Sequence, residues 1–194
     1  MTSTARRWIF CLFICGIAGS HSPLWSQGAA SKAVLLKVPF EKQAEPTLCG
    51  IAAMGMITGY YGQKLDETQY YYLKLDAKQN GGITGATLEV VLRASGYYTA
   101  IFKGTLDRKL TGLYRDLDLK RPLIVMVASP DGKTRHYAVV TGYDLKKKVL
   151  FLSDPAGGEN EPYSVDQFVK GWDRVDDFTL LAVPQEMERL TPTP

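Results

Sequence analysis

The sequence predicts an α+β domain, in which a helical half packs against an antiparallel sheet. Apolar residues at helical spacing between capping residues fill the first half of the chain. Short β-branched and aromatic runs bounded by turn residues fill the second half. The chain has 194 residues, 45% hydrophobic and 22% charged, which suits one domain with a full core. This composition excludes an intrinsically disordered, coiled-coil or collagen-like protein.

The first 20 residues have the three-part form of a secretory signal peptide. Arg6 and Arg7 precede an apolar run at residues 8–18, and small residues follow at 18–20. The run is too short to cross a membrane of roughly 30 Å. We therefore expect cleavage of residues 1–20 and export, periplasmic or secreted, without stable membrane insertion.

Lipoprotein modification at Cys15 is a weaker alternative, because Ile14 stands where the processing enzyme needs a small side chain. Residues 21–32 are small and polar, so we expect a flexible lead-in. The folded domain is expected over residues 33–186, with a C-terminal tail at 187–194.

The helical half contains three predicted helices behind one short strand. Thr47 and Asp66 are N-cap candidates for the first two helices. Gly62 and Gly96 follow the ends of the first and third helices, where glycine accepts a left-handed conformation. The predicted strand covers residues 33–38, and the helices cover 48–61, 66–75 and 86–94.

The second half is predicted to be mainly strands. Turn residues at 129–132 and 144–148 separate three of these strands, which should form an antiparallel meander. Ser164 is an N-cap candidate for a late helix ending at Trp172. Strands are predicted at 97–102, 123–128, 137–143, 149–153 and 178–183, with helices near 106–117 and at 164–172.

Two residues are singled out by their scarcity. Removal of the signal peptide takes away Cys11 and Cys15, so Cys49 becomes the one cysteine of the mature chain. A lone cysteine in an exported protein is either an inert buried residue or a reactive thiol. His136 is the one histidine besides His21, which lies at the new amino terminus. Taken alone, a histidine at the start of a strand is more often structural than catalytic.

Together these two residues predict a nucleophile and a general base. Cys49 lies in the first turn of a predicted helix, where the helix dipole stabilises a thiolate, and a nearby imidazolium would do so more strongly. One cysteine and one histidine are too few ligands for zinc, so we expect no metal and no cofactor. The net charge of +3 is too small and too evenly spread to predict nucleic-acid binding.

Two further side chains could complete an acyl-transfer site. Asp154 follows a strand that should pair with the strand starting at His136, so its carboxylate could orient the imidazole. Gln43 lies six residues before Cys49, and its amide could donate to an oxyanion. Asp154 could equally be a turn aspartate, and Gln43 an ordinary loop residue.

The chain resembles the papain-like double-glycine leader (bacteriocin-processing) peptidases, the thirty-ninth family of cysteine peptidases. The resemblance covers nearly all of residues 36–184 and includes the end of the chain, which is similar to stand-alone exported members. Its motifs are Val38-Pro39-Phe40 with Gln43, Leu48-Cys49-Gly50-Ile51-Ala52-Ala53 to Tyr60-Tyr61-Gly62, His136-Tyr137-Ala138-Val139-Val140-Thr141-Gly142-Tyr143, and Leu152-Ser153-Asp154-Pro155-Ala156-Gly157.

The resemblance implies a papain-like fold and a cysteine peptidase with a peptide or protein substrate. It makes Cys49 the nucleophile, His136 the base and acid, Asp154 the orienting residue and Gln43 the oxyanion donor. Ile51 stands where proline is common in the family, which should affect only the start of the helix. No transporter membrane domain or ATPase is expected, so the identity of the substrate stays open. A thiol acyltransferase or amidase on the same fold and a non-catalytic peptide-binding module are the alternatives.

Overall fold

The computed structural model describes residues 33–129 and 131–190, so the predicted signal peptide and lead-in lie outside the described residues. The elements follow in the order β1 (Ala33–Leu35), η1 (Pro46–Leu48), α1 (Cys49–Tyr60), α2 (Glu67–Asn80), α3 (Gly85–Ala94), β2 (Tyr97–Lys103), α4 (Leu113–Asp118), β3 (Leu123–Ala128), β4 (Arg135–Asp144), β5 (Val149–Ser153), β6 (Glu161–Ser164), α5 (Val165–Trp172), η2 (Asp173–Val175), β7 (Phe178–Pro184) and α6 (Gln185–Leu190).

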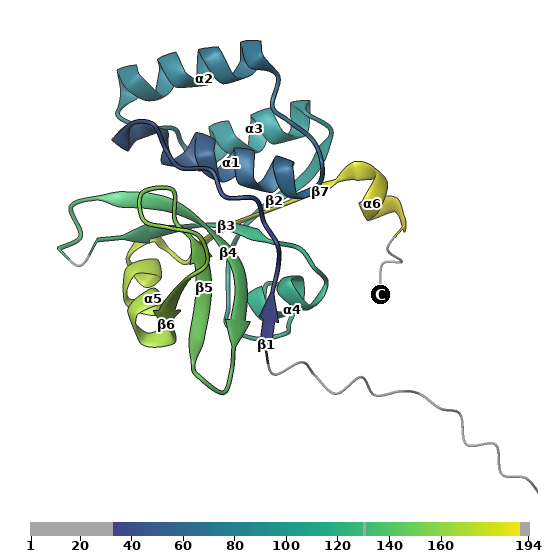
Figure 1. The fold of residues 1–194 in the computed structure, drawn as a ribbon, viewed down its shortest axis with the longest axis vertical. Helices are drawn as coiled ribbons and strands as arrows, with labels where there is room; N and C mark the ends of the chain where they lie inside the picture. The colour runs from purple at the N-terminus through teal and green to yellow at the C-terminus, as the bar shows by residue number, and fades with distance from the viewer. Residues whose placement is uncertain (1–32, 130, 191–194) are drawn as a thin grey trace, which may run out of the picture. The chain divides into compact units, whose positions relative to one another are not determined.

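The predicted α+β class is confirmed. Helices α1, α2 and α3 lie together on one side of the sheet, and α5 lies on the other side (Figure 1). The sheet has the strand order β2-β7-β3-β4-β5-β6, with β1 paired to β4. Every strand pair in it is antiparallel. Strands β3, β4 and β5 form the expected meander.

Helix α1 is the central element of the helical half. It carries no charged residue, and nine of its twelve residues are buried. A helix that is apolar on all sides must be covered on all sides, and α1 contacts α2, α3, β3 and β4. Its first residue, Cys49, therefore lies where the helices meet the sheet.

The boundaries differ from the prediction where capping geometry decides them. Helix α2 continues past residue 75 to Asn80, because the left-handed residue that ends it is Gly81, with φ 73°. The expected cap at Thr47 is wrong. The residue before α1 is Leu48, no side chain caps the helix, and a 3-10 turn at Pro46–Leu48 leads into it.

Only the end of the helix predicted near residues 106–117 is helical. Residues before α4 form a loop in which one carboxylate oxygen of Asp107 accepts hydrogen bonds from the Thr105 hydroxyl and the Lys109 backbone N–H. Such local bonds compete with a helix. The strand predicted at 33–38 is also shorter, although Leu36 still donates its backbone N–H to the Thr141 carbonyl.

Strand β6 and helix α6 were not predicted from the sequence. Strand β6 has only four residues and includes Pro162, which weakens a strand signal. Helix α6 (Gln185–Leu190) crosses the boundary expected at residue 186 between the domain and its tail. Among the described residues, no helix combines the length and apolarity needed to span a membrane.

Candidate active site

Cys49 is the first residue of α1, and the residue is only 8% exposed. Burial alone raises the pKa of a thiol, but the opposing contacts are stronger here. The His136 side chain and the backbone N–H groups of Tyr137 and Gly50 hydrogen-bond the sulfur and place the pKa of Cys49 below its ordinary value. The helix N-terminus favours the same negative charge. The thiolate is therefore the stabilised form.

His136 joins Cys49 to Asp154. It is the second residue of β4, and its Nε2 lies 2.5 Å from Oδ1 of Asp154. Since Nε2 is engaged there, Nδ1 is the ring nitrogen left for Cys49. Burial lowers the pKa of the imidazole, but the hydrogen bonds and charges of Asp154 and Cys49 raise it to about 9. The ring is thus favoured as an imidazolium between two anions.

The pairing of β4 with β5 brings Asp154 to His136. Val139 lies opposite Ser153 in this pair, so the residue after β5 falls near the start of β4. Burial raises the pKa of Asp154, but His136 and two backbone N–H groups lower it by more, so the pKa lies below its ordinary value. These N–H groups belong to Ala156 (2.8 Å) and Gly157 (3.2 Å), and both donate to Oδ1. The carboxylate stays ionised in one orientation.

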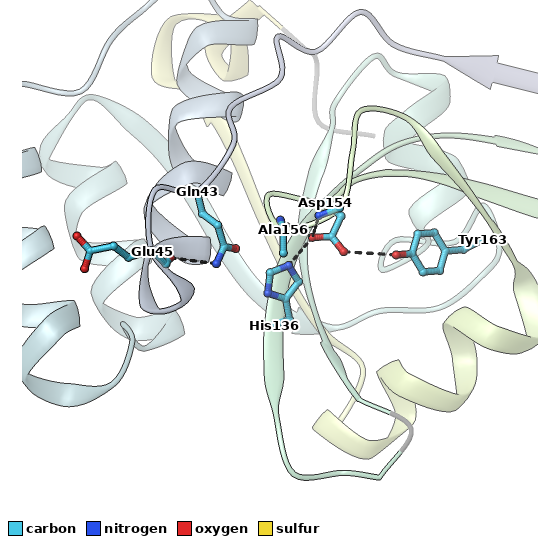
Figure 2. Close-up of polar contacts among 7 residues, drawn as sticks. Gln43, Glu45, His136, Asp154, Ala156 and Tyr163 are labelled. Atoms are coloured by element: carbon cyan, nitrogen blue, oxygen red, sulfur yellow. Dashed lines mark hydrogen bonds and ion pairs between the residues drawn. The ribbon is translucent and has the colours of Figure 1, made fainter.

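Gln43 approaches the same site from the chain segment before α1 (Figure 2). Its backbone N–H donates to the Pro155 carbonyl at 3.0 Å, which ties this segment to the loop that carries Asp154. Its side-chain Nε2 donates to the Glu45 carbonyl, also at 3.0 Å. An amide nitrogen has two N–H groups, so one remains for another acceptor. The Gln43 Oε1 atom is buried and has no hydrogen-bond partner among the described residues.

The structure therefore brings together the four residues singled out in the sequence. It also adds a fifth, Tyr163 of β6, whose hydroxyl donates to Oδ2 of Asp154 at 3.4 Å (Figure 2). Sequence reasoning missed Tyr163 because it missed β6. A tyrosine shortly after Asp154 carries no spacing signal of its own, since the contact depends on how β6 pairs with β5.

A groove of about 580 Å³ opens beside Cys49, between the helical half and the sheet. The Gly81 to Ala86 segment lines it on the helical side, and Met126, Tyr137 and Phe178 line it on the sheet side. Such a concave surface next to a nucleophile can hold an extended substrate. The described residues contain no group of three histidine, cysteine or acidic side chains placed to hold a metal ion.

A family model described as "Peptidase_C39 like family" matches residues 35–178. The chain belongs to this family. The resemblance drawn from the sequence motifs is thereby confirmed.

Curated relatives point the same way. The transport/processing ATP-binding protein ComA of Streptococcus pneumoniae, from strains R6 and TIGR4, is 31% identical over 123 residues. The match covers 61% of this chain but only 15% of the ComA chain. This C39-like chain thus spans a small part of the length of those relatives.

Solved structures share the fold. The peptidase domain of Streptococcus ComA superposes with a TM-score of 0.60 at 23% identity, covering 75% of this chain and 98% of that domain. A C39-like peptidase from Bacillus anthracis gives 0.58 at 15% identity, covering 80% and 99%. A double glycine motif protease from an AMS/PCAT transporter, solved in complex with its leader peptide, gives 0.59 at 19% identity, covering 78% and 95%. The predicted papain-like peptidase fold is confirmed.

Proposed function

We propose that this C39-like chain is a cysteine peptidase that hydrolyses peptide bonds through Cys49. The observation that carries the proposal is the continuous contact from the Cys49 thiol through the His136 ring to the Asp154 carboxylate. A thiolate paired with an imidazolium that a carboxylate orients is the arrangement for covalent acyl transfer. The double glycine motif protease solved with a leader peptide supports a peptide as the substrate.

In the first half of the reaction, the Cys49 sulfur attacks the carbonyl carbon of the scissile bond and forms a C–S bond. The negative charge moves to the carbonyl oxygen, where the Cys49 backbone N–H and the free N–H of Gln43 Nε2 donate to it. The His136 imidazolium then gives its proton to the leaving nitrogen as the C–N bond breaks. The product is a thioester on Cys49 and a neutral imidazole.

In the second half, His136 takes a proton from water as the water oxygen attacks the thioester carbon. The C–S bond breaks, the acid product leaves, and the thiolate and imidazolium are restored. Asp154 stays ionised throughout and keeps the ring in place. If an amine replaces water at this step, the same residues catalyse transpeptidation.

The decisive experiment measures cleavage of a diverse peptide library by mass spectrometry, with the recombinant chain and its Cys49→Ala variant. We expect wild-type cleavage and only background in the variant, because the covalent path is gone. Cys49→Ala should also abolish labelling by a thiol-directed peptide probe. Cleavage by Cys49→Ala of a wild-type substrate would reject the proposal. Absence of both cleavage and labelling in the wild type would favour a binding module, and amine adducts would favour an acyltransferase.

We further propose that the enzyme acts outside the cytoplasm, on the basis of the signal-peptide pattern in residues 1–20. Amino-terminal sequencing of protein recovered from the culture medium or periplasm tests this. A mature chain starting near His21 is expected, and a retained segment at residues 8–18 would contradict export by cleavage.

A further inference from the structure

A second candidate site lies at Glu41, which belongs to the segment before α1 and is not one of the four candidate catalytic residues. The Glu41 carboxylate packs directly on the backbone of α1, since a Cβ atom placed on Gly55 would lie 1.9 Å from its Oε2. Within the described part of the chain, no hydrogen bond or ion pair satisfies this carboxylate. Burial raises its pKa. A half-buried carboxylate without a protein partner can accept hydrogen bonds from a ligand that enters beside it.

Glu41 lines a cavity of about 680 Å³ between the segment before α1, helix α1 itself and helix α2. Gly55 and Gly59 of α1 bring no side chain, so Glu41 and Pro39 pack directly on the helix there. The walls are mainly apolar and include three aromatic rings. These rings and their apolar neighbours are Phe40, Tyr70, Tyr71, Pro39 and Leu65.

The other charged groups of the cavity do not neutralise Glu41. Lys64, Glu67 and Lys74 also line it, but neither lysine forms an ion pair with Glu41 within 4.0 Å. Lys74 instead lies 3.9 Å from Glu45, which Lys78 also contacts at 2.9 Å. The cavity therefore presents a carboxylate among aromatic rings, with room for a long side chain.

We propose that this cavity binds a basic side chain, lysine or arginine, of the peptide substrate. The aliphatic stem would pack on the rings, the cation would lie near their faces, and its N–H groups would donate to Glu41. Glu41 is two residues from Gln43, so the segment before α1 contributes side chains both to the cavity and to the candidate active site, and we therefore assign the cavity to the peptide substrate. The substrate assignment rests on the proposed peptidase function, whereas the ligand chemistry rests on the cavity alone.

The cavity is tested first by binding, without catalysis. Nα-acetyl-lysine amide and its uncharged analogue Nα-acetyl-norleucine amide are titrated into the wild-type chain and followed by NMR. We expect saturable binding of the lysine probe, at least about tenfold tighter than the norleucine probe. Glu41→Gln should remove this preference. Glu67→Gln removes the same charge from a more exposed part of the cavity, and this variant should still prefer the lysine probe.

Equal binding of the two probes would overturn the proposal. An equal loss of the preference for the lysine probe in Glu67→Gln would overturn it as well. That result would indicate that the overall negative charge of the cavity, and not Glu41 itself, attracts the cation.

The substrate assignment is tested with matched peptides. In a cleaved peptide, lysine and glutamine are compared at each position on both sides of the scissile bond. We expect one position where lysine raises kcat/KM about tenfold in the wild type and not in Glu41→Gln. No such position would overturn the assignment.

Labelling of Cys49 by a thiol-directed probe separates the two proposals. If Glu41→Gln keeps the labelling and loses the lysine preference, both stand. If the wild-type chain is not labelled and cleaves no peptide, yet binds the lysine probe through Glu41, the peptidase function and the substrate assignment fail and the cation-binding cavity stands.

Discussion

Among the described residues, the Tyr163 hydroxyl is the one hydrogen-bond donor to Oδ2 of Asp154, at 3.4 Å, while the His136 ring and the Ala156 and Gly157 backbone N–H groups contact Oδ1. Tyr163 lies on β6, and Asp154 follows β5, which pairs with β6. The carboxylate is therefore held on both sides, by the turn and His136 at one oxygen and by Tyr163 at the other. We infer that Tyr163 positions Asp154 and, through it, the His136 ring.

Tyr163→Phe should lower kcat by about twofold to tenfold and leave KM nearly unchanged. A long hydrogen bond contributes at the lower end of the usual range, and Tyr163 does not contact the groove beside Cys49. Steady-state kinetics on a cleaved peptide measure this. Tyr98→Phe changes an exposed tyrosine of β2 and should have no effect. A raised KM with unchanged kcat in Tyr163→Phe would contradict the positioning role.

Asp154→Asn should cost less activity than Asp154→Ala. The asparagine carbonyl can still accept from His136, Ala156 and Gly157, and its NH₂ group can donate to the Tyr163 oxygen. Alanine loses all four contacts. The comparison of kcat/KM for the two variants decides this, and an Asn variant as inactive as Ala would show that the negative charge matters more than the geometry.

Gln43→Ala should lower kcat by roughly 10²–10³ with little change in KM, since the donated bond strengthens only in the transition state. Gln79→Ala, at the exposed end of α2, is the matched control. Kinetics near the wild-type level in Gln43→Ala would remove Gln43 from the oxyanion site.

Alkylation of Cys49 by iodoacetamide should already be fast at neutral pH and change little up to about pH 8. The pKa of Cys49 is lowered and that of His136 is raised to about 9, so the thiolate coexists with the imidazolium over a range of pH below about 9. His136→Ala removes the cation, and the reaction rate should then rise only near the ordinary thiol pKa of about 8.5. His21→Ala is the control. A wild-type rate that rises only near that ordinary value would exclude the ion pair.

Gly142→Ala should lower the free energy of unfolding by about 1–3 kcal/mol. A Cβ atom at Gly142 would lie 2.2 Å from the Val34 carbonyl oxygen, so β1 would have to move away from β4. Urea denaturation followed by circular dichroism measures the change. An unchanged midpoint would show that β1 contributes little to stability.

Much of the fold could be predicted because local signals and tertiary contacts agree. The meander was predictable from turn residues between β-branched runs, and the Asp66 cap from its side chain, which accepts the Thr68 and Gln69 N–H groups. Prediction was poorer where a local hydrogen bond overrides the pattern, as at Asp107 before α4. It was also poorer at β6, which is too short to show periodicity.

The sequence by itself determined the class of the fold and the pair of Cys49 and His136, because apolar spacing and the scarcity of both residue types are properties of the chain. Only the tertiary structure decided that Tyr163 contacts Asp154 and that Gln43 is tied to the Asp154 loop. It also left Glu41 unpaired in an aromatic cavity. These relationships depend on strand pairing and on the packing of the Glu41 carboxylate against α1. Hydrogen-bond geometry over a few ångströms is not encoded in residue spacing.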